Sequence, residues 1–374
     1  MPINEVAEQA AKKALVDNNY KKIKQFCLEY DENTLISTVV KANSYGLGMF
    51  ETSMALYEVG CRIYYVATPE EGIKLRMKFS DISIYILDGL FKDTENLYQQ
   101  YSLVPCLSSL DQIRAWYDWG QKDRQQLPCV IHFNTGINRL GVELEDYINI
   151  DAYILDALNI DHILSHFASA DEPLDIQNIE QINRFEQITQ KVPEYRRSFG
   201  NSAAIALKKL QDVEAKNTNI LRPGIAIFGV KTTNNYPIDL EPVVEISARI
   251  LQIIDLKKGD KIGYNHTYIC DENIKAAVIS AGYADGLFRA LGTSNSNQDA
   301  YFYFDDYKLP ILGRISMDMT VVDVSNVPED KLREATFVEI IGTNISLEMM
   351  AEWSNTISYE ILTNIGPRFQ KRYI

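Results

Sequence analysis

The sequence predicts an α/β chain in which a (β/α)8 barrel is followed by a mostly β domain. Up to about residue 230, short apolar runs rich in β-branched residues alternate with longer amphipathic stretches of helical spacing. After Gly229 the pattern is mostly β, with little helix. The chain has 374 residues, of which 46% are hydrophobic, so it is long enough for two domains with separate cores. We therefore expect a barrel domain over residues 1–231 and a β-rich domain over residues 232–374.

Eight apolar runs are the predicted strands of the barrel. Eight βα units of this combined length match the (β/α)8 fold, whose usual length is about 250 residues. A doubly wound sheet is the alternative, but the G-x-G-x-x-G turn of its dinucleotide-binding form is absent. The predicted strands are Leu35–Ala42, Ile63–Thr68, Ile82–Asp88, Leu103–Leu107, Cys129–Asn134, His162–Phe167, Arg197–Gly200 and Arg222–Phe228.

The second domain is predicted to begin after a polar linker at Lys231–Pro237. A Ser/Asn-rich loop, Thr293–Gln298, separates two of its strands, and only Ser346–Trp353 has a clear helical pattern. At the other end of the chain, residues Glu5–Lys13 predict a helix. The predicted strands of the second domain are Val244–Asp255, Ile262–Ile269, Ile274–Ala281, Ala300–Phe304, Pro310–Ile315 and Phe337–Ile341.

Composition argues against several classes of protein. A formal net charge of −14 disfavours nucleic-acid binding, which needs clustered lysine and arginine. The five cysteines form no C-x-x-C pair and have no histidine at metal-ligand spacing, so neither a disulfide framework nor a metal site is indicated. The N-terminus lacks the apolar segment of a signal peptide, and no apolar run is long enough to span a membrane. We expect a soluble, cytoplasmic protein.

The segment VVKANSYGLG, residues Val39–Gly48, contains the first candidate for catalysis. Lys41 stands where a β-branched run ends, and the two glycines that follow allow a tight turn. An amine at the carboxyl end of a buried strand is partly desolvated, which lowers its pKa and lets it form a Schiff base with an aldehyde cofactor. For this segment alone, a salt-bridged surface lysine is the simpler interpretation. The assignment therefore depends on the other residues at the strand ends.

Other polar residues follow the predicted strands on the face where barrel enzymes collect their functional loops. Taken singly, each has an ordinary structural interpretation, such as a hydrogen-bonded core histidine or a helix N-cap. On a shared rim, the Ser202 hydroxyl, the N–H groups of Gly224 and Ile225, and Tyr45 suit a phosphate. With Lys41 they predict a pyridoxal phosphate site. The rim residues are His132, Asn134–Gly141, His166, Asn201–Ser202 and Arg222–Ile225.

Eight segments occur in order along the chain: VVKANSYGLG, FNTGINRLGV, LSHFASADE, NSAA, LRPGIAIFG, IGYNHTY, SAGYADG and GRISMDM. In this order they resemble the alanine racemases, which are fold-type III pyridoxal phosphate enzymes. The resemblance covers about residues 35–374. It implies a (β/α)8 barrel followed by a β domain, and a head-to-tail homodimer in which the partner's second domain completes each active site.

The resemblance also implies a role for each matching residue. Lys41 would be the Schiff-base lysine and the base on one face of the substrate, and Tyr264 would reach the opposite face from the other subunit. Racemisation needs both, since one group removes the Cα proton and another returns a proton to the far side. Arg222 would face the pyridine nitrogen and disfavour its protonation. His166 would pack on the cofactor ring, and Arg139 would contact the phenolic oxygen and the substrate carboxylate. The implied phosphate ligands are Tyr45, Ser202, Gly224, Ile225 and Tyr359, and the implied substrate contacts are Arg139, Tyr283, Met317 and Asp318.

Three features depart from the family's pattern. Leu47 stands where many members carry histidine. His132 stands where many carry a carbamylated lysine that orients the arginine matching Arg139. Because imidazole cannot form a carbamate, Arg139 must be held by the imidazole itself, a bound anion or a water. Finally, the predicted helix Glu5–Lys13 replaces the family's usual N-terminal strand.

The leading hypothesis is a pyridoxal phosphate enzyme that interconverts L- and D-alanine and supplies D-alanine for peptidoglycan. Proton transfer would occur at an aldimine between substrate and cofactor, with Lys41 and Tyr264 on opposite faces. A serine or broad-specificity racemase is the nearest alternative. A catalytically silent pyridoxal phosphate-binding barrel is the alternative from another class, and the presence of a second domain with the Tyr264 motif argues against it.

Overall fold

The computed structural model describes residues 7–11, 13–207, 220–293 and 299–374. Within these residues the chain forms two compact units. The barrel unit contains the described residues of 16–44 and 48–241. The β unit contains residues 45–47 and 242–374 together with the described residues before Val16.

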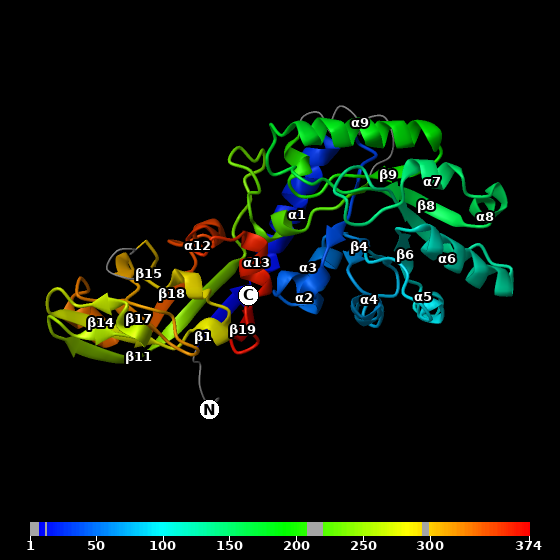
Figure 1. Ribbon diagram of the computed structural model, residues 1–374. Helices are drawn as coiled ribbons and strands as arrows, with labels where there is room; N and C mark the ends of the chain where they lie inside the picture. Colours follow the sequence, from blue (N-terminus) through cyan, green and yellow to red (C-terminus); the bar gives the residue numbers. More distant parts are fainter. Residues whose placement is uncertain (1–6, 12, 208–219, 294–298) are drawn as a thin grey trace. The chain divides into compact units, whose positions relative to one another are not determined.

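The barrel unit is built on a parallel sheet in the order β3-β4-β5-β6-β7-β8-β9, coloured from blue to green in Figure 1. Most of its strands are buried at every position except the first, as expected where both faces of a parallel sheet are covered. The strands are β2 (Leu35–Ile36), β3 (Thr38–Val39), β4 (Ile63–Val66), β5 (Ser83–Ile86), β6 (Val104–Leu107), β7 (Pro128–His132), β8 (Asn159–Leu164), β9 (Arg196–Ser198) and β10 (Ile220–Leu221).

Backbone hydrogen bonds close this sheet into a barrel. β10 pairs in parallel with β2, and the Val39 N–H donates to the Pro223 carbonyl at 3.0 Å. On the other side of β10, the Arg222 N–H donates to the Gly200 carbonyl at 2.8 Å. The (β/α)8 barrel predicted from the sequence is confirmed, with β2 and β3 as two halves of its first strand.

The helices of the barrel unit begin and end at recognisable signals. Ser109 caps α6 by accepting the Gln112 N–H at 3.2 Å. α9 buries Ile182, Phe185 and Ile188, which recur at helical spacing along one face. The helices are α1 (Lys13–Leu28), α3 (Met49–Glu58), α4 (Pro69–Arg76), α5 (Glu95–Gln100), α6 (Leu110–Asp123), α7 (Leu144–Ile148), α8 (Ala152–Asp156) and α9 (Ile176–Lys191), with short 3₁₀ helices η1 (Ala204–Ala206) and η2 (Ile225–Phe228).

One predicted barrel strand is wrong. The sequence predicts a strand over Arg222–Phe228, but β10 ends at Leu221 and η2 follows. Pro223 has no N–H to donate to a sheet, and Gly224 takes φ −122° and ψ −85°, which turns the chain out of the extended conformation. The seven other predicted strands each overlap an observed strand.

The β unit is organised by one long strand, β11, which spans 13 residues and is the extended yellow-green arrow in Figure 1. β11 pairs antiparallel with β1, β14 and β18, so it joins most of the sheet. The strands are β1 (Ala7–Ala11), β11 (Val244–Leu256), β12 (Lys261–Ile262), β13 (Tyr268–Ile269), β14 (Ile274–Ile279), β15 (Tyr301–Phe304), β16 (Tyr307–Pro310), β17 (Thr320–Asp323), β18 (Phe337–Ile341) and β19 (Gln370–Tyr373). The helices are η3 (Tyr264–His266), η4 (Tyr283–Asp285), η5 (Arg289–Leu291), α11 (Glu329–Glu334), α12 (Leu347–Trp353) and α13 (Ser358–Thr363).

The β-rich second domain is confirmed, but the predicted N-terminal helix Glu5–Lys13 is wrong. Ala7–Ala11 form β1, which lies between β11 and β19 in the sheet. Two rows of inter-strand hydrogen bonds outweigh the local helix propensity of this alanine-rich segment. The predicted continuous strand Ile262–Ile269 is also wrong, because Gly263 takes φ 68° and the turn Tyr264–His266 follows.

Smaller differences concern the rest of the second domain. The strand predicted at Pro310–Ile315 lies earlier, at β16, and the sequence analysis missed β17, β19, α11 and α13. Each of the missed elements is only four to six residues long, which is too short for periodicity to identify. The loop predicted at Thr293–Gln298 lies, apart from Thr293, outside the described residues.

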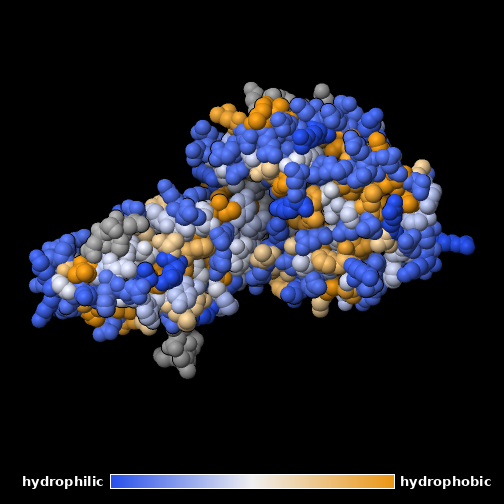
Figure 2. All heavy atoms as spheres, viewed as in Figure 1, coloured by the Kyte–Doolittle hydropathy of each residue, from blue (hydrophilic) through white to orange (hydrophobic). Residues whose placement is uncertain are grey.

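The surface is predominantly hydrophilic on the face drawn in Figure 2, with scattered hydrophobic patches. Among the described residues, no helix has the length and apolarity needed to cross a membrane. All five cysteines are buried free thiols.

Gly46→Ala should destabilise the β unit strongly. Gly46 has φ +84°, and a Cβ there would lie 2.4 Å from the Leu362 carbonyl oxygen. The matched control is Gly259→Ala in the same unit, which has φ +92° and no heavy atom within 4 Å of the added Cβ. In both variants an alanine must adopt a left-handed backbone conformation, which lowers the free energy of unfolding by about 1 kcal/mol. Only Gly46→Ala also overpacks its surroundings, which costs about 1–3 kcal/mol more. Chemical denaturation measures both, and equal losses would contradict the close contact.

Candidate functional site

Lys41 opens a turn of unusual handedness. Ala42, Asn43 and Ser44 have φ between 52° and 56°, and Tyr45 also has a positive φ of 54°. The segment labelled α2 in Figure 1 (Lys41–Tyr45) is therefore a left-handed turn of L-residues. Each such residue costs about 1–2 kcal/mol, and strain of this kind persists only where the surroundings enforce it. The sequence predicted a tight turn here but not its handedness.

Glu71 is the main support of this turn. Its carboxylate accepts the Ala42 N–H at 2.7 Å and the Ala67 N–H at 2.9 Å. On the far side of the turn, the Asn43 side-chain oxygen accepts the Met49 N–H at 2.9 Å. Glu71 is not predictable from the sequence as a support for this turn, because an acidic residue in the first turn of a helix is common for other reasons.

The Lys41 amine lies in a partly buried, positively charged environment. Burial lowers its pKa, and the charges of Arg139 and Arg222 lower it further, while Asp88 and Glu71 act in the opposite direction. Burial also raises the pKa of Asp88, although Lys41 opposes this shift. A lysine with a lowered pKa holds more of its amine in the neutral, nucleophilic form.

Arg222 is buried at the end of the last barrel strand, with only 3% of its surface exposed. Its guanidinium donates to the Ser165 carbonyl at 2.6 Å and to the Ser198 hydroxyl. It also contacts the Nδ1 atom of His166 at 3.5 Å, and because a guanidinium can only donate, His166 Nδ1 is the acceptor. The structure thus brings together Arg222 and His166, which the sequence predicts on one rim of the barrel.

His132 and His166 are both neutral. Burial lowers the pKa of His132 to about 3, and the charges of Arg222 and Arg139 contribute. The same three causes hold the pKa of His166 well below its usual range. Neither ring nitrogen of His132 has a hydrogen-bond partner among the described residues. The position that the sequence analysis flagged as a departure is therefore an unpaired, neutral imidazole.

Arg139 is presented by a loop that Asn134 organises. The Asn134 side-chain oxygen accepts the N–H groups of Gly136 and Asn138, both at 3.1 Å. Its amide group donates to Glu143 at 2.7 Å. Arg139 itself is exposed, so the loop, rather than burial, sets the position of its backbone.

The Ser202 hydroxyl lies at the start of η2. It accepts the Gly224 N–H at 2.9 Å and the Ala226 N–H at 3.3 Å. A hydroxyl that accepts two N–H groups keeps its own proton as a donor, and the first turn of a helix favours an anion. Together with the buried Arg222 cation, this donor set fits an anionic cofactor such as pyridoxal phosphate.

In the β unit, Tyr45 and Tyr359 form a ring pair with centroids 6.0 Å apart. Tyr45 is buried, which raises the pKa of its phenol, and Tyr359 adds to the shift. The Tyr45 phenol therefore stays protonated at neutral pH and remains available as a hydrogen-bond donor. The structure brings together these two members of the predicted phosphate cradle.

Three loops of the β unit carry the residues that the resemblance assigned to the substrate side. We name them the Tyr264, Tyr283 and Met317 loops. The Tyr283 N–H donates to the Ser316 carbonyl at 3.0 Å, which joins the Tyr283 loop to the Met317 loop. The Tyr264 loop lies beside the Met317 loop, since a Cβ on Gly263 would meet Arg314 backbone atoms at 3.6–3.7 Å. The side chains of these loops are exposed: Tyr264 by 68%, Met317 by 53% and Tyr283 by 43%.

Asp318 belongs to an ion-pair network that the sequence analysis did not identify. Arg368 contacts Asp318 at 2.8 Å and Asp285 at 3.1 Å. Asp285 in turn accepts the Gly282 N–H at 2.9 Å. Arg368 therefore links the Tyr283 loop to the Met317 loop.

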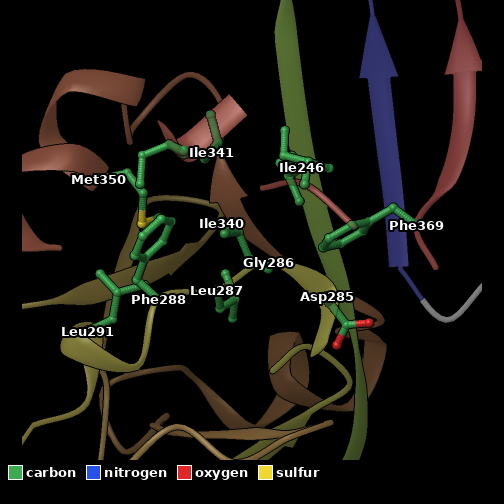
Figure 3. Close-up of a pocket in the computed structure, with 12 residues that line it drawn as sticks. Ile246, Asp285, Gly286, Leu287, Phe288, Leu291, Ile340, Ile341, Met350 and Phe369 are labelled. Atoms are coloured by element: carbon green, nitrogen blue, oxygen red, sulfur yellow. The ribbon is translucent and has the colours of Figure 1, made fainter. Parts of the chain in front are cut away.

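An apolar pocket in the β unit is too small for a substrate. Figure 3 shows Phe288 and Met350 on one side of it, Ile246 and Phe369 on the other, and Asp285 at its edge. Its volume is about 20 Å³, which is close to that of one water molecule. We interpret it as a packing defect of the core.

Both halves of the chain match domains of one known protein family. A profile described as alanine racemase, N-terminal domain, matches residues 13–232, and one described as alanine racemase, C-terminal domain, matches residues 243–373. The chain belongs to the alanine racemase family. An alanine racemase of Rickettsia bellii is 38% identical over 349 residues, which cover 92% of this chain and 82% of that protein. One from Brucella ovis is 34% identical over 357 residues, covering 91% and 88%.

Solved structures of the family agree with this fold. Alanine racemase from Bartonella henselae, whose structure has covalently bound pyridoxal phosphate, superposes with a TM-score of 0.90 at 32% identity, covering 99% of this chain and 100% of that one. Alanine racemase from Acinetobacter baumannii gives a TM-score of 0.85 at 26% identity, covering 98% and 99%.

His132→Gln should reduce the acid sensitivity of the fold. An unfolded histidine takes up a proton below about pH 6.5, whereas His132 in the folded protein does so only near pH 3. Between these values the unfolded state binds more protons, so the free energy of unfolding falls as pH falls. We expect the free energy of unfolding, measured by urea denaturation between pH 4 and 6, to depend less steeply on pH in the variant. The slope should fall by the equivalent of about one proton, or about 1.4 kcal/mol per pH unit. An unchanged slope would contradict the neutral imidazole.

Proposed function

We propose that this protein interconverts L- and D-alanine with pyridoxal phosphate as its cofactor. The observation that carries the proposal is Lys41, whose pKa is lowered by burial and whose strained turn is held by Glu71 beside the Arg222 site. Membership of the alanine racemase family supports the same reaction. The D-alanine formed would serve peptidoglycan synthesis in the cytoplasm.

Residues of the barrel unit, with Tyr45 and Tyr359 of the β unit, would hold the cofactor. Lys41 would attach it covalently, Arg222 would face its pyridine nitrogen and His166 would pack on its ring. The Ser202 hydroxyl, the Ile225 N–H and the phenols of Tyr45 and Tyr359 would bind its phosphate. The Gly224 N–H, which donates to the Ser202 hydroxyl, would be shared between that hydroxyl and the phosphate. When bound, pyridoxal phosphate withdraws the electron pair that remains at Cα after its proton is removed.

Two groups of this chain would move the proton. We assign Lys41 Nζ to one face of the substrate and the Tyr264 hydroxyl, from the partner subunit of a head-to-tail homodimer, to the other. The 68% exposure of Tyr264 on its own chain suits a side chain that a second copy covers. A two-sided arrangement is required because inversion at Cα returns the proton to the face opposite its removal. We place the boundary between the two contributing domains at residues 231 and 232.

The substrate carboxylate and methyl group would contact different residues. Arg139 would pair with the carboxylate and with the cofactor's phenolic oxygen. Tyr283, Met317 and Asp318 would form the partner-supplied wall around the side chain. Arg368 stabilises this wall by pairing with Asp318 and Asp285.

The direct test is D-alanine formation from L-alanine by the purified protein with pyridoxal phosphate, beside an identical reaction with L-serine. Fast turnover of alanine with little turnover of serine is the expected result. Comparable rates would instead identify a broad-specificity racemase. A bound cofactor without turnover of either amino acid would identify a silent binding protein and refute the proposed function.

Lys41→Ala should abolish covalent attachment of the cofactor and lower racemisation by about 10²–10⁴, the scale expected for losing a positioned acid–base group. The visible absorption of the purified protein and intact-protein mass after borohydride reduction measure the attachment. Lys74→Ala, an exposed lysine on α4, is the matched control and should behave as wild type. A Lys41→Ala protein that retains the reduced adduct would refute the assignment.

Tyr264→Phe should impair the two directions of exchange unequally. If Tyr264 serves the face of L-alanine, single-turnover deuterium incorporation at Cα should fall by about 10²–10⁴ for L-alanine and far less for D-alanine. Tyr268→Phe removes a buried phenol four residues away and serves as the control. Equal losses for both enantiomers would contradict the division of the two faces.

A further inference from the structure

A group of polar side chains fills part of the barrel interior, where branched aliphatic residues are usual. Tyr65 on β4 lies beside Tyr85 on β5 in the parallel register, and their rings stack with centroids 4.8 Å apart. The His162 ring, on β8, meets the Tyr85 ring edge-on at 5.0 Å. Tyr65 and His162 have no exposed surface, and Tyr85 is 5% exposed. Groups buried this deeply need hydrogen-bond partners.

Hydrogen bonds connect each member of this group, directly or through His162, to Asp161. Asp161 contacts His162 Nδ1 at 2.7 Å, and His162 Nε2 contacts the Tyr65 hydroxyl at 2.9 Å. Asp161 also accepts the Tyr85 hydroxyl at 2.8 Å and pairs with Arg196. Burial alone raises the pKa of Asp161, but the hydrogen bonds from His162 and Tyr85 and the charge of Arg196 hold it below its usual value.

The charge of Asp161 determines the tautomer of His162. A carboxylate only accepts hydrogen bonds, so the proton of the imidazole lies on Nδ1. Burial lowers the pKa of His162 although Asp161 opposes the shift, so the ring is neutral and Nε2 is an acceptor. The Tyr65 hydroxyl therefore donates to Nε2, and this bond orients the Tyr65 ring.

The Tyr65 ring ends this network beneath Arg222. The guanidinium carbon of Arg222 lies 5.8 Å from the ring centroid, within the range of a cation–π contact. The charge of Arg222 acts on both Tyr65 and His162. The network thus connects the Asp161–Arg196 ion pair, on neighbouring strands, with the buried cation of the candidate cofactor site.

We propose that Tyr65, His162 and Asp161 are positioning residues for Arg222. Asp161 orients His162, His162 orients Tyr65, and the Tyr65 ring supports one side of the Arg222 guanidinium. The Ser165 carbonyl and the Ser198 hydroxyl accept hydrogen bonds from the same guanidinium. This inference rests on the proposed function, in which Arg222 faces the pyridine nitrogen. Displacing a positioned group by about 1 Å can cost about 10²-fold in rate. The Tyr65 contact is only one of the supports of Arg222, so we expect its loss to lower kcat about tenfold.

The test compares two phenylalanine variants that each remove one hydroxyl from the same network. Tyr65→Phe breaks the bond to His162 and frees the ring beneath Arg222. Tyr85→Phe breaks a bond to Asp161, which is two hydrogen bonds further from Arg222 along the network than the Tyr65 ring, and is the matched control. We expect Tyr65→Phe alone to lower kcat about tenfold with little change in KM. We also expect it alone to change the pH dependence of the bound cofactor's absorption and to weaken pyridoxal phosphate binding.

Variants of His162 keep the test valid even where the Tyr65→Phe protein folds poorly. His162→Gln keeps an acceptor for the Tyr65 hydroxyl, whereas His162→Leu does not. We expect His162→Leu to reproduce the spectrum and affinity of Tyr65→Phe, and His162→Gln to restore them in part. Indistinguishable cofactor spectra and affinities in Tyr65→Phe and Tyr85→Phe, or in the two His162 variants, would overturn the proposal.

The same measurements separate this proposal from the proposed function. A wild-type protein that binds pyridoxal phosphate but forms no D-alanine would refute the racemase activity. The cofactor spectra of the four variants would still support or overturn the positioning of Arg222, because they do not require turnover.

Discussion

The seam that closes the barrel sets the geometry on which the candidate site depends. The Ser37 N–H donates to the Leu221 carbonyl at 3.0 Å, and the Val39 N–H donates to the Pro223 carbonyl at 3.0 Å. Lys41 follows the first strand of this seam by two residues, and Arg222 lies between its two acceptors. Residues that are 181 positions apart in the chain (41 and 222) are thereby placed at one rim by backbone hydrogen bonds, which involve no side-chain atoms.

Positive charge is concentrated at this rim. Lys41, Arg139 and Arg222 act on one another and on His132 and His166. Burial is the first cause of the lowered pKa values of the amine and of both imidazoles, and the neighbouring positive charges lower these pKa values further. Such a field favours an anionic cofactor and a substrate carboxylate, and it makes the lysine more nucleophilic without a dedicated base beside it.

Both units contain costly local features that their surroundings hold in place. In the barrel unit, Ala42, Asn43 and Ser44 adopt the left-handed conformation one after another, and Glu71 binds the turn that they form. In the β unit, Gly282 lets one loop approach the Met317 carbonyl so closely that a Cβ would lie 2.4 Å from it. The Arg368 ion pairs hold the same two loops together. Strain and close approach of this kind are typical of sites whose groups must stay in one arrangement.

The sequence by itself determined the fold class, the family and most strands, because alternating β and helical patterns and ordered motifs depend on local residue types. It also identified Lys41, Arg222, His166 and Ser202 as residues of one rim, since barrel loops collect at the carboxyl ends of strands. Only the tertiary structure decided that the N-terminal alanine-rich segment is a strand, because its partners β11 and β19 lie more than 200 residues away. The same holds for the neutral state of His132, the support from Glu71 and the buried network below Arg222. Each of these depends on burial and on contacts between distant segments, which the local pattern of residues does not contain.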